Sequence, residues 1–320
     1  MDAADLKFFE AVARLGNMSR AAAELHTVQS NVTARIREFE ARLGAPLFVR
    51  HARGVELAPA GRRLLPHARR VLHMLAEAHR VARDDGTPEG PLVIGALETT
   101  TALRLAPALA RFTAAYPAVD LTVRTGTTCE LLAQVLDNAL EGAFVCGPVA
   151  DPALEVETVF REELAVFSAP GLRSLDALVA LGAGLRMIVL RKGCSYRQRL
   201  EDVLTRRGVP APRVLEFGTL EAILACVAAG LGITLLPRSL VGAVARLGQV
   251  ALHPLPAGEG QVETMFIRRR DAYRSSALAS FLAMLPRQDD GSIRDWGHEK
   301  PHAPGADPLD TRGRVRGIRS

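Results

Sequence analysis

The sequence contains no apolar run long enough to cross a membrane, and its first residues are polar or charged. A membrane-spanning helix needs about 20 consecutive apolar residues, and a signal peptide needs a shorter apolar core behind basic residues. Neither pattern is found in the chain. We therefore expect a cytoplasmic protein without a membrane partner.

Cysteine is scarce, and the cysteines lie far apart without a CxxC pair. Zinc sites need cysteines or histidines at short, regular spacings, so we expect no metal. The sequence also has no phosphate-binding loop and no dinucleotide-binding glycine pattern, and we expect no cofactor. The cysteines are Cys129, Cys146, Cys194 and Cys226.

The sequence does not predict an enzyme. Cys194 is the best candidate for a nucleophile, but a nucleophilic cysteine needs a base beside it. All histidines lie far from Cys194 along the chain. They are His26, His51, His67, His73, His79, His253, His298 and His302.

The composition is that of a globular protein with more than one domain. Hydrophobic residues make up 48% of the chain and charged residues 23%, which is ordinary for such proteins. The 320 residues are enough for two or three domains with a sizeable core.

Positive charge is modest in total but uneven along the chain. The net charge is +5, yet many arginines stand between positions 50 and 70 against the single acid Glu56. Such a cluster is typical of a surface that contacts nucleic acid, although alone it also fits a solvated helix face. These arginines are Arg50, Arg53, Arg62, Arg63, Arg69 and Arg70.

The stretch from Ser19 to Leu43 predicts two helices joined by a tight turn, for which an ordinary pair of core helices is the alternative. Ser19 and Thr27 stand where N-caps are expected. Apolar residues of the second helix recur at steps of three and four and predict a buried stripe, while the opposite face suits a major groove. The stripe is Val28, Val32, Ile36, Phe39 and Leu43, and the opposite face is Gln29, Ser30, Thr33, Ala34 and Arg37.

The flanking segments complete a small domain around these two helices. Residues 2–16 predict a first helix that ends at Gly16 and closes a three-helix core. After Gly44, residues 49–57 predict a short basic hairpin. A basic hairpin that follows a helix-turn-helix is placed like a wing that touches DNA phosphates.

A long helix is predicted to begin at Pro59, a residue favoured in a first helical turn, and to end at a linker over 84–90. Small and apolar residues recur along it at alternating steps of three and four, which is a heptad seam. Packing on its own domain is the alternative, and we favour dimerisation. The seam is Leu64, Ala68, Val71, Leu75, Ala78 and Ala82.

From residue 91 onward, short apolar runs alternate with amphipathic helical patterns. This alternation predicts an α/β fold with mostly parallel sheets. Strands are expected over 92–96, 121–124, 143–146, 164–168, 187–190, 214–217, 233–236 and 264–267. Helices are expected near 100–115, 129–140, 174–181, 195–208, 219–230, 238–246 and 272–285.

Hydroxyl-bearing loops follow several of the expected strands, over 98–101, 125–128, 191–197 and 218–219. Each places hydroxyls just before a helix, where free backbone N–H groups favour anions. Any single one of Thr99, Ser195 and Thr219 also fits a simple N-cap. If the four loops converge, they form a pocket for a small anion, which we expect to be a carboxylate.

Several segments resemble the LysR-type transcriptional regulators. The likeness covers about residues 2–286 and is most specific in the first 65 residues. The segments are Phe8-Phe9, Ser19-Arg20-Ala21-Ala22, Gln29-Ser30, Leu47-Phe48-Val49-Arg50, Leu57-Ala58-Pro59-Ala60-Gly61 and, with a looser match, Ala228-Ala229-Gly230-Leu231-Gly232-Ile233-Thr234-Leu235-Leu236-Pro237.

The resemblance implies a winged helix-turn-helix, a linker helix that dimerises, and a two-lobed effector domain like the periplasmic binding proteins. Its partners would be double-stranded promoter DNA, a small-molecule effector bound between the lobes, further copies in a homodimer or homotetramer, and RNA polymerase. The expected bounds are 1–58 for the DNA-binding domain, 59–87 for the linker helix, 91–286 for the effector domain (lobe I 91–163 and 266–286, lobe II 164–265) and 287–320 for a disordered tail.

The resemblance also places site residues by position. Gln29, Ser30, Thr33 and Ala34 fall where the family contacts bases, and the full set expected at DNA is Ser19, Thr27, Gln29, Ser30, Thr33, Arg35, Arg37, Arg50 and Arg53. The set expected at the effector is Thr99, Thr100, Thr128, Cys146, Cys194, Ser195 and Thr219.

A thiol-based redox sensor on the same scaffold is the alternative function. Cys146 and Cys194 both stand at the ends of expected strands, which is its support in the sequence.

Overall fold

A computed structural model describes residues 1–51, 54–172, 174–180, 182–191, 193–209, 212–241, 248–256 and 258–286. The expected tail over 287–320, the wing residue Arg53 and much of the helix expected over 238–246 lie outside these residues. Within the described part of the chain, no helix has both the length and the apolar character needed to span a bilayer.

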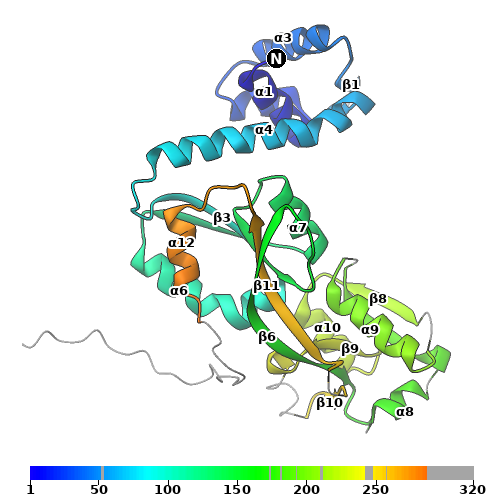
Figure 1. Ribbon diagram of the computed structural model, residues 1–320. Coiled ribbons are helices and arrows are strands. Elements are labelled where there is room, and N and C mark those ends of the chain that lie inside the picture. The colour runs from blue at the N-terminus through cyan, green and yellow to red at the C-terminus, as the bar shows by residue number, and fades with distance from the viewer. Residues whose placement is uncertain are drawn as a thin grey trace, which may run out of the picture. The chain divides into compact units, whose positions relative to one another are not determined.

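The N-terminal domain is built on the predicted three helices, α1 (Ala3–Leu15), α2 (Met18–Glu24) and α3 (Gln29–Leu43) (Figure 1). They pack around Phe9 and Phe39, whose rings meet edge to face at 6.2 Å. The first and third helices end at Gly16 and Gly44, which adopt φ angles of 62° and 66°. Glycine takes this left-handed conformation without strain, so both helix ends are set by the sequence.

The predicted caps and part of the predicted stripe are wrong. Ser19 is not an N-cap: Asn17 caps α2 and accepts hydrogen bonds from the N–H groups of Ser19 and Arg20. Thr27 is not an N-cap either, because Val28 occupies that position of α3 with an extended backbone. The α3 stripe is therefore shorter than predicted, with Val28 65% and Leu43 40% exposed.

The predicted wing is an antiparallel hairpin of β1 (Phe48–His51) and β2 (Gly54–Leu57). Helix α4 (Pro59–Arg83) follows directly, with proline in its first turn as predicted. A Cβ atom on Gly61 would lie 2.2 Å from the carbonyl oxygen of Leu47. Only glycine allows this contact, which fixes the start of α4 against the residues before the wing.

The predicted seam of α4 divides into two parts. Leu64 and Ala68 pack on the core of the N-terminal domain. Beyond them, the large seam residues Val71 (42%) and Leu75 (41%) are exposed in the single chain. Two large apolar side chains outside the predicted seam, Met74 (56%) and Val81 (43%), are exposed as well. The N-terminal domain therefore accounts for only the first part of the seam.

The remaining residues form the expected two-lobed α/β unit. The larger sheet has the strand order β10-β6-β11-β5-β3-β4, with β9 also paired to β6, and a separate sheet holds β7 and β8. The strands are β3 (Gly90–Ala96), β4 (Val119–Thr125), β5 (Gly142–Cys146), β6 (Leu154–Ser168), β7 (Arg186–Leu190), β8 (Arg213–Phe217), β9 (Thr234–Pro237), β10 (Ala251–Pro254) and β11 (Gln261–Arg269).

The expectation of mostly parallel sheets is only partly right. Strand β3 runs parallel to β4 and β5, and β7 runs parallel to β8. In contrast, β11 is antiparallel to β5 and β6, and β6 is antiparallel to β9 and β10. Strand β10 and the first half of β6 were not predicted at all.

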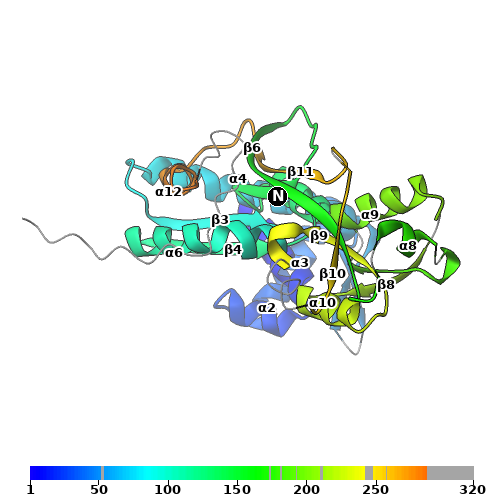
Figure 2. The ribbon, with the colours of Figure 1, turned by 90° about the horizontal axis from the view of Figure 1, so that it is seen from below.

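Strand β6 belongs to both lobes. Its residues up to Glu163 pair with β11, whereas Leu164 and the residues after it pair with β9 and β10. The partner changes where lobe II is expected to begin. Figures 1 and 2 show β6 and β11 running from lobe I, which contains β3–β5, toward lobe II, which contains β7–β10.

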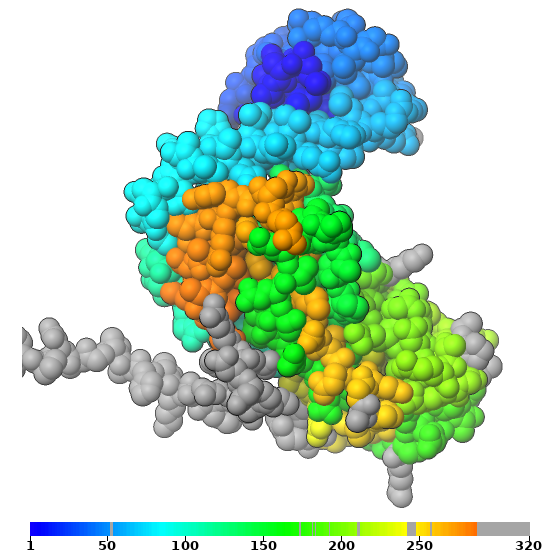
Figure 3. All heavy atoms as spheres, viewed as in Figure 1, coloured from blue at the N-terminus to red at the C-terminus, as the bar shows by residue number. Residues whose placement is uncertain are grey.

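Helices cover both lobes. In lobe I, α12 places Leu278 and Phe281 in an aromatic core with Phe112 and Phe144, and the orange segment of Figure 3 lies beside green β6 on this face. The helices are α5 (Glu98–Thr100), the π-helical turn η1 (Thr101–Leu105), α6 (Ala106–Ala115), α7 (Thr128–Leu136), α8 (Leu175–Val179), the 3₁₀ turn η2 (Gly182–Gly184), α9 (Ser195–Arg206), α10 (Leu220–Ala228) and α12 (Ser276–Ala283).

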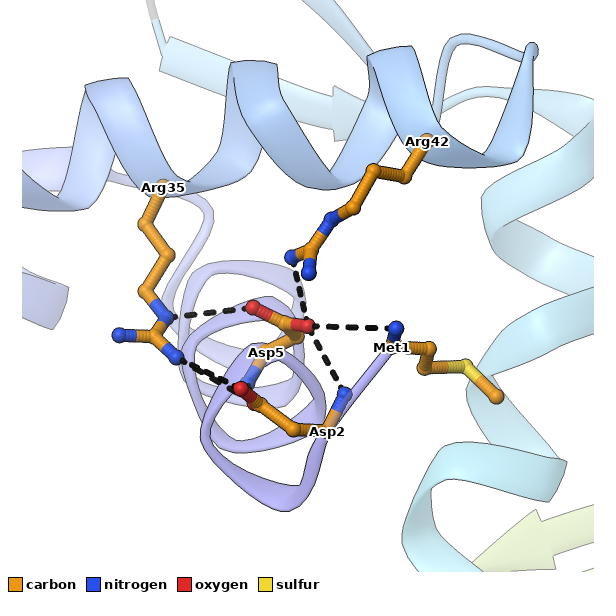
Figure 4. A network of polar contacts seen from close by, with 5 residues as sticks. All are labelled: Met1, Asp2, Asp5, Arg35 and Arg42. Atoms are coloured by element: carbon orange, nitrogen blue, oxygen red, sulfur yellow. Dashed lines mark hydrogen bonds and ion pairs between the residues drawn. The ribbon is translucent and has the colours of Figure 1, made fainter.

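A buried carboxylate joins α1 to α3 (Figure 4). Asp5 is 1% exposed, and its Oδ1 and Oδ2 lie 3.2 Å from Arg35 Nε and 2.7 Å from Arg42 Nη2. Arg35 also reaches Asp2 Oδ2 at 3.2 Å and lies over the ring of Phe8. Two arginines of α3 are therefore held by acids of α1.

Opposing effects act on the pKa of Asp5. Burial raises it, but the hydrogen bond from the N–H of Asp2 and the hydrogen bonds and charges of Arg42 and Arg35 together outweigh burial. The pKa is lowered as a result. The contribution of this carboxylate to folding is therefore present in full above its unfolded pKa, near 4, and is lost as the pH falls through the folded value.

We expect Asp5→Asn to destabilise the N-terminal domain by about 1–3 kcal/mol at pH 7, because two arginines lose a charged acceptor. Amide hydrogen exchange of α1 and α3 peptides in the full-length protein measures this loss. The matched control is Glu38→Gln, which changes an exposed acid of α3. The difference between wild type and Asp5→Asn should begin to shrink below about pH 4 and continue to fall as the pH drops through the lowered folded pKa. A difference that stays constant as the pH is lowered from about 7 through this range would contradict the assignment.

Candidate functional site

The start of α3 presents the predicted polar face to solvent. Gln29, Ser30 and Arg37 are exposed, and Ala34 is exposed between them. The Ser19 hydroxyl donates to Gln29 Oε1 at 2.9 Å, so the start of α2 positions the first side chain of α3. An exposed helix N-terminus that carries hydrogen-bonding side chains has the chemistry needed to read base edges.

Other residues expected at DNA have different surroundings. Thr33 is half-buried, and the Thr27 hydroxyl accepts a hydrogen bond from Asn31 Nδ2 at 2.9 Å. The guanidinium of Arg35 is held by Asp5 and Asp2 and stacks on Phe8. These contacts argue against the expectation that Arg35 binds phosphate, because its donors already hold α1 against α3.

Arg50 is the arginine of the wing that the structure describes. Its side chain is exposed, and no ion pair or hydrogen bond joins it to any residue the structure describes. The neighbouring His51 instead lies 3.5 Å from Glu56 across the hairpin. An exposed arginine of this kind is able to meet a phosphate without first giving up a partner.

A second site lies where the two lobes meet. Loops after β3, β4 and β7 and the end of β5 enclose a cavity of about 40 Å³, which holds roughly three water-sized groups. Lobe I contributes Leu97, Glu98, Thr99, Thr125, Gly126, Thr127 and Cys146. Lobe II contributes Leu190, Arg191, Cys194, Ser195 and Tyr196.

Hydrogen bonds cross from the first turns of α9 to lobe I at this cavity. The Ser195 hydroxyl donates to Thr128 Oγ1 at 3.1 Å, and the Thr99 hydroxyl donates to Tyr196 Oη at 3.4 Å. Arg199 donates to the carbonyl of Gly147 at 3.3 Å. Two of these three bonds join neutral hydroxyls, and Ser195, Thr99 and Tyr196 also line the cavity.

The predicted effector residues do not all meet. Thr99, Cys146, Cys194 and Ser195 line the cavity. Thr128 stands behind Ser195 and also accepts a hydrogen bond from the backbone N–H of Cys146.

Besides Thr128, two more predicted residues lie outside the lining. The Thr100 hydroxyl is buried and has no hydrogen-bond partner in the described part of the chain. Thr219 caps α10 by accepting from the N–H of Ala222, so its loop does not join the convergence that we expected.

The charged residues of the lining were not predicted. Glu98 and Arg191 stand within two of the expected loops, but the hydroxyl pattern did not single them out. One acid and one base balance each other, so the cavity lacks the excess positive charge of a simple anion site. Tyr196, also missed, has a raised pKa because of burial and the nearby charge of Glu162.

The capping of α7 removes one anion-binding group from the cavity. Thr127 is the N-cap residue, and its backbone N–H donates to Glu130 Oε2 at 2.8 Å while its hydroxyl accepts from the N–H of Glu130. This capping box satisfies two donors internally. The predicted attraction of this helix start for an anion is therefore weaker than the sequence suggested.

The two thiols of the cavity are poorly suited to redox chemistry. Burial raises the pKa of Cys146, more than the charge of Arg199 lowers it. Burial likewise raises the pKa of Cys194. Reactive cysteines require a thiolate, which a raised pKa disfavours near pH 7. In addition, no three His, Cys, Asp or Glu side chains gather at metal-binding distance among the residues that the structure covers.

Comparisons with known proteins agree with this architecture. Residues 3–62 match the family model of the bacterial regulatory helix-turn-helix protein of the lysR family, and residues 85–290 match the LysR substrate binding domain. The chain is 43% identical over 282 residues to the uncharacterized HTH-type transcriptional regulator YusT of Bacillus subtilis, covering 88% of this chain and 94% of that protein.

Two further comparisons extend over similar lengths. The HTH-type transcriptional regulator CzcR of Bacillus cereus is 40% identical over 285 residues, which are 89% of this chain and 97% of that protein. Full-length CbnR, in a crystal structure with its target DNA, has the same fold with a TM-score of 0.64. That structure is 24% identical and covers 89% of this chain and 99% of CbnR.

We expect iodoacetamide to alkylate exposed Cys129 faster than Cys146 by about tenfold or more at pH 7.5. Burial shields Cys146 and lowers its thiolate fraction. Mass spectrometry of the cysteine peptides measures the rates, and protein unfolded in urea is the control in which the rates converge. Fast alkylation of Cys146 and Cys194, with a disulfide after peroxide treatment, would support the redox alternative instead.

Proposed function

The chain belongs to the LysR family of DNA-binding transcriptional regulators with an effector-binding domain, and on this premise we propose which surfaces perform the two tasks. Helix α3 and the wing contact the operator, and a small molecule in the cavity between the lobes modulates regulation. The observation that carries the effector assignment is that both lobes line one cavity and form hydrogen bonds across it.

Base recognition is assigned to the start of α3. Gln29 and Ser30 are exposed on its first turn, and Ser19 holds the Gln29 side chain by a hydrogen bond. A glutamine at the N-terminus of a recognition helix is suited to bind adenine, which offers a hydrogen-bond donor and an acceptor on its major-groove edge. Arg37 and Arg50 are exposed and are assigned to phosphates, whereas Arg35 is left to the internal network.

Effector control follows from lobe closure. A ligand changes the arrangement of the lobes only if it binds one arrangement more tightly than another. The cavity is bounded by both lobes, so its shape depends on how closely they approach. A ligand that contacts both lobes therefore binds one arrangement of the lobes more tightly than another. Thr99, Ser195 and Tyr196 are assigned to ligand binding, since they form the cross-lobe hydrogen bonds and also face the cavity.

Assembly is assigned to α4. Its exposed apolar side chains, from Val71 to Val81, have the periodicity of a helix pair and no cover in the single chain. A dimer that pairs α4 with a second copy places two recognition helices on one DNA duplex, and pairing of dimers gives a tetramer. Such a regulator works in the cytoplasm on chromosomal promoters, and RNA polymerase is its proposed downstream partner.

A footprint on the DNA upstream of its own gene tests the DNA-binding assignment. Gln29→Ala should weaken specific binding by about 1–3 kcal/mol and relax the preference at one base pair of each half-site. Arg50→Ala should weaken binding to all sequences alike and reduce the slope of log affinity against log salt.

Glu221→Gln, on an exposed position of α10, is the control that should leave both properties unchanged. An equal loss of affinity for every sequence in Gln29→Ala would show that α3 is not the recognition helix.

We expect Leu75→Glu to break the proposed helix pair, because it places a charge at an exposed apolar position of the α4 seam. Sedimentation of the purified protein should show a lower oligomeric state, and circular dichroism should show that the chain stays folded. Ala76→Glu makes the same change in charge one residue away, off the predicted seam. If both variants keep the wild-type oligomer, α4 is not the assembly surface.

A further inference from the structure

We propose that the effector of the cavity is a short zwitterion, with a protonated amine held by Glu98 and a carboxylate held by Arg191. This inference rests on the proposed function of the cavity and adds the chemical class of its ligand. It is carried by the placement of two opposite charges on the two lobes.

The two charges face one cavity from different elements. Glu98 begins α5 after β3 in lobe I, and Arg191 directly follows β7 in lobe II, and both line the cavity. Their backbone carbonyls accept from Thr101 and Cys194, but neither side chain forms a hydrogen bond or an ion pair with any residue that the structure describes. Charged side chains at a ligand cavity that are not paired with each other are available to a ligand that carries both complementary charges.

Glu98 and Arg191 are the acid and the base of the lining, and further charges lie behind it. Arg199 acts on Cys146 by its charge and donates to the carbonyl of Gly147 at 3.3 Å, whereas Glu162 acts on Tyr196 and pairs with Arg104 at 3.1 Å. The carboxylate of Glu130 lies near Arg191, but it already accepts the N–H of Thr127 in the capping box. The pKa values of Cys146, Cys194 and Tyr196 are raised, so these groups are neutral near pH 7. A ligand with only a negative charge would be repelled by Glu98, and a ligand with only a positive charge would be repelled by Arg191. In each case, one charged side chain of the lining would also lack an opposite charge on the ligand.

The remaining lining suits a small polar molecule. The cavity is small, about 40 Å³, and partly open to solvent, so a short molecule fills it and a longer one has to extend out of it. Hydroxyls of Thr99, Thr127 and Ser195 stand around it and offer both donors and acceptors. These features favour a short amino acid over an aromatic or long-chain effector.

The test uses the full-length protein and a matched panel of probes. The zwitterions are glycine, L-alanine, D-alanine, β-alanine and L-serine, the acids are acetate and propionate, and the amines are ethylamine and propylamine. Calorimetric titration and the melting temperature measure binding. At least one zwitterion should bind about tenfold or more tightly than the acid and the amine of similar size, because each singly charged probe lacks one charged hydrogen-bonding group.

Single substitutions separate the two charges. Glu98→Gln should weaken the zwitterion about tenfold and spare or improve the acid, whereas Arg191→Gln should weaken the zwitterion and spare or improve the amine. Glu221→Gln and Arg213→Gln, on exposed positions without a partner in the described residues, are the matched controls. The proposal is overturned if no zwitterion binds, if an acid or amine binds as tightly, or if the two variants lose affinity without this change in selectivity.

A third variant separates this inference from the function on which it rests. Ser195→Trp fills the cavity and should abolish zwitterion binding. If instead an acid or an amine binds, depends on the open cavity and alters the DNA footprint, the cavity is the effector site and the zwitterion is wrong. If probes bind wild type and Ser195→Trp equally, the effector site lies elsewhere and the proposed function of the cavity fails with it.

Discussion

Strand β6 is the constraint on which the effector domain depends. One unbroken strand pairs with β11 up to Glu163 and with β9 and β10 from Leu164 onward, so both lobes share a backbone in addition to their side-chain contacts. The lobes are therefore unable to separate as independent bodies, and any change of angle must bend this strand and β11. Loops from both lobes bound the cavity. The shape of the cavity therefore depends on the angle between the lobes.

Much of the fold was predictable because its signals are local. Helix periodicity predicted α1, α3 and α4, and glycines predicted two helix ends, since both depend on residues close together in the chain. The first half of β6 was missed because it is charged and half-exposed, and its pairing with β11 joins residues about 100 positions apart, as with Glu163 and Gln261. The cap at Asn17 was missed because Ser19 offered an equally good pattern two residues later.

The sequence predicted which loops form the candidate sites, but not which side chains of those loops face the ligand. Hydroxyls before helices predicted the loops at Thr99, Thr127 and Ser195, which do converge. The same pattern included Thr219, which only caps its own helix, because capping and ligand binding use the same residues at the same positions. The sequence also did not predict which arginines face solvent. Arg35 is spaced like a surface residue, and only the packing of α1 places Asp5 beside it.

The hydroxyl contacts between the lobes bear on the closure proposed above. The bonds of Ser195 to Thr128 and of Thr99 to Tyr196 join neutral groups, and each contributes only about 0.5–1.5 kcal/mol net because water offers equivalent partners. Even a millimolar ligand has about 4 kcal/mol of binding free energy, which is enough to change the population of the closed lobes if most of it is specific to that state. Under the proposed closure, a ligand of millimolar affinity therefore suffices, and regulation by such a ligand follows the concentration of an abundant molecule rather than that of a trace one.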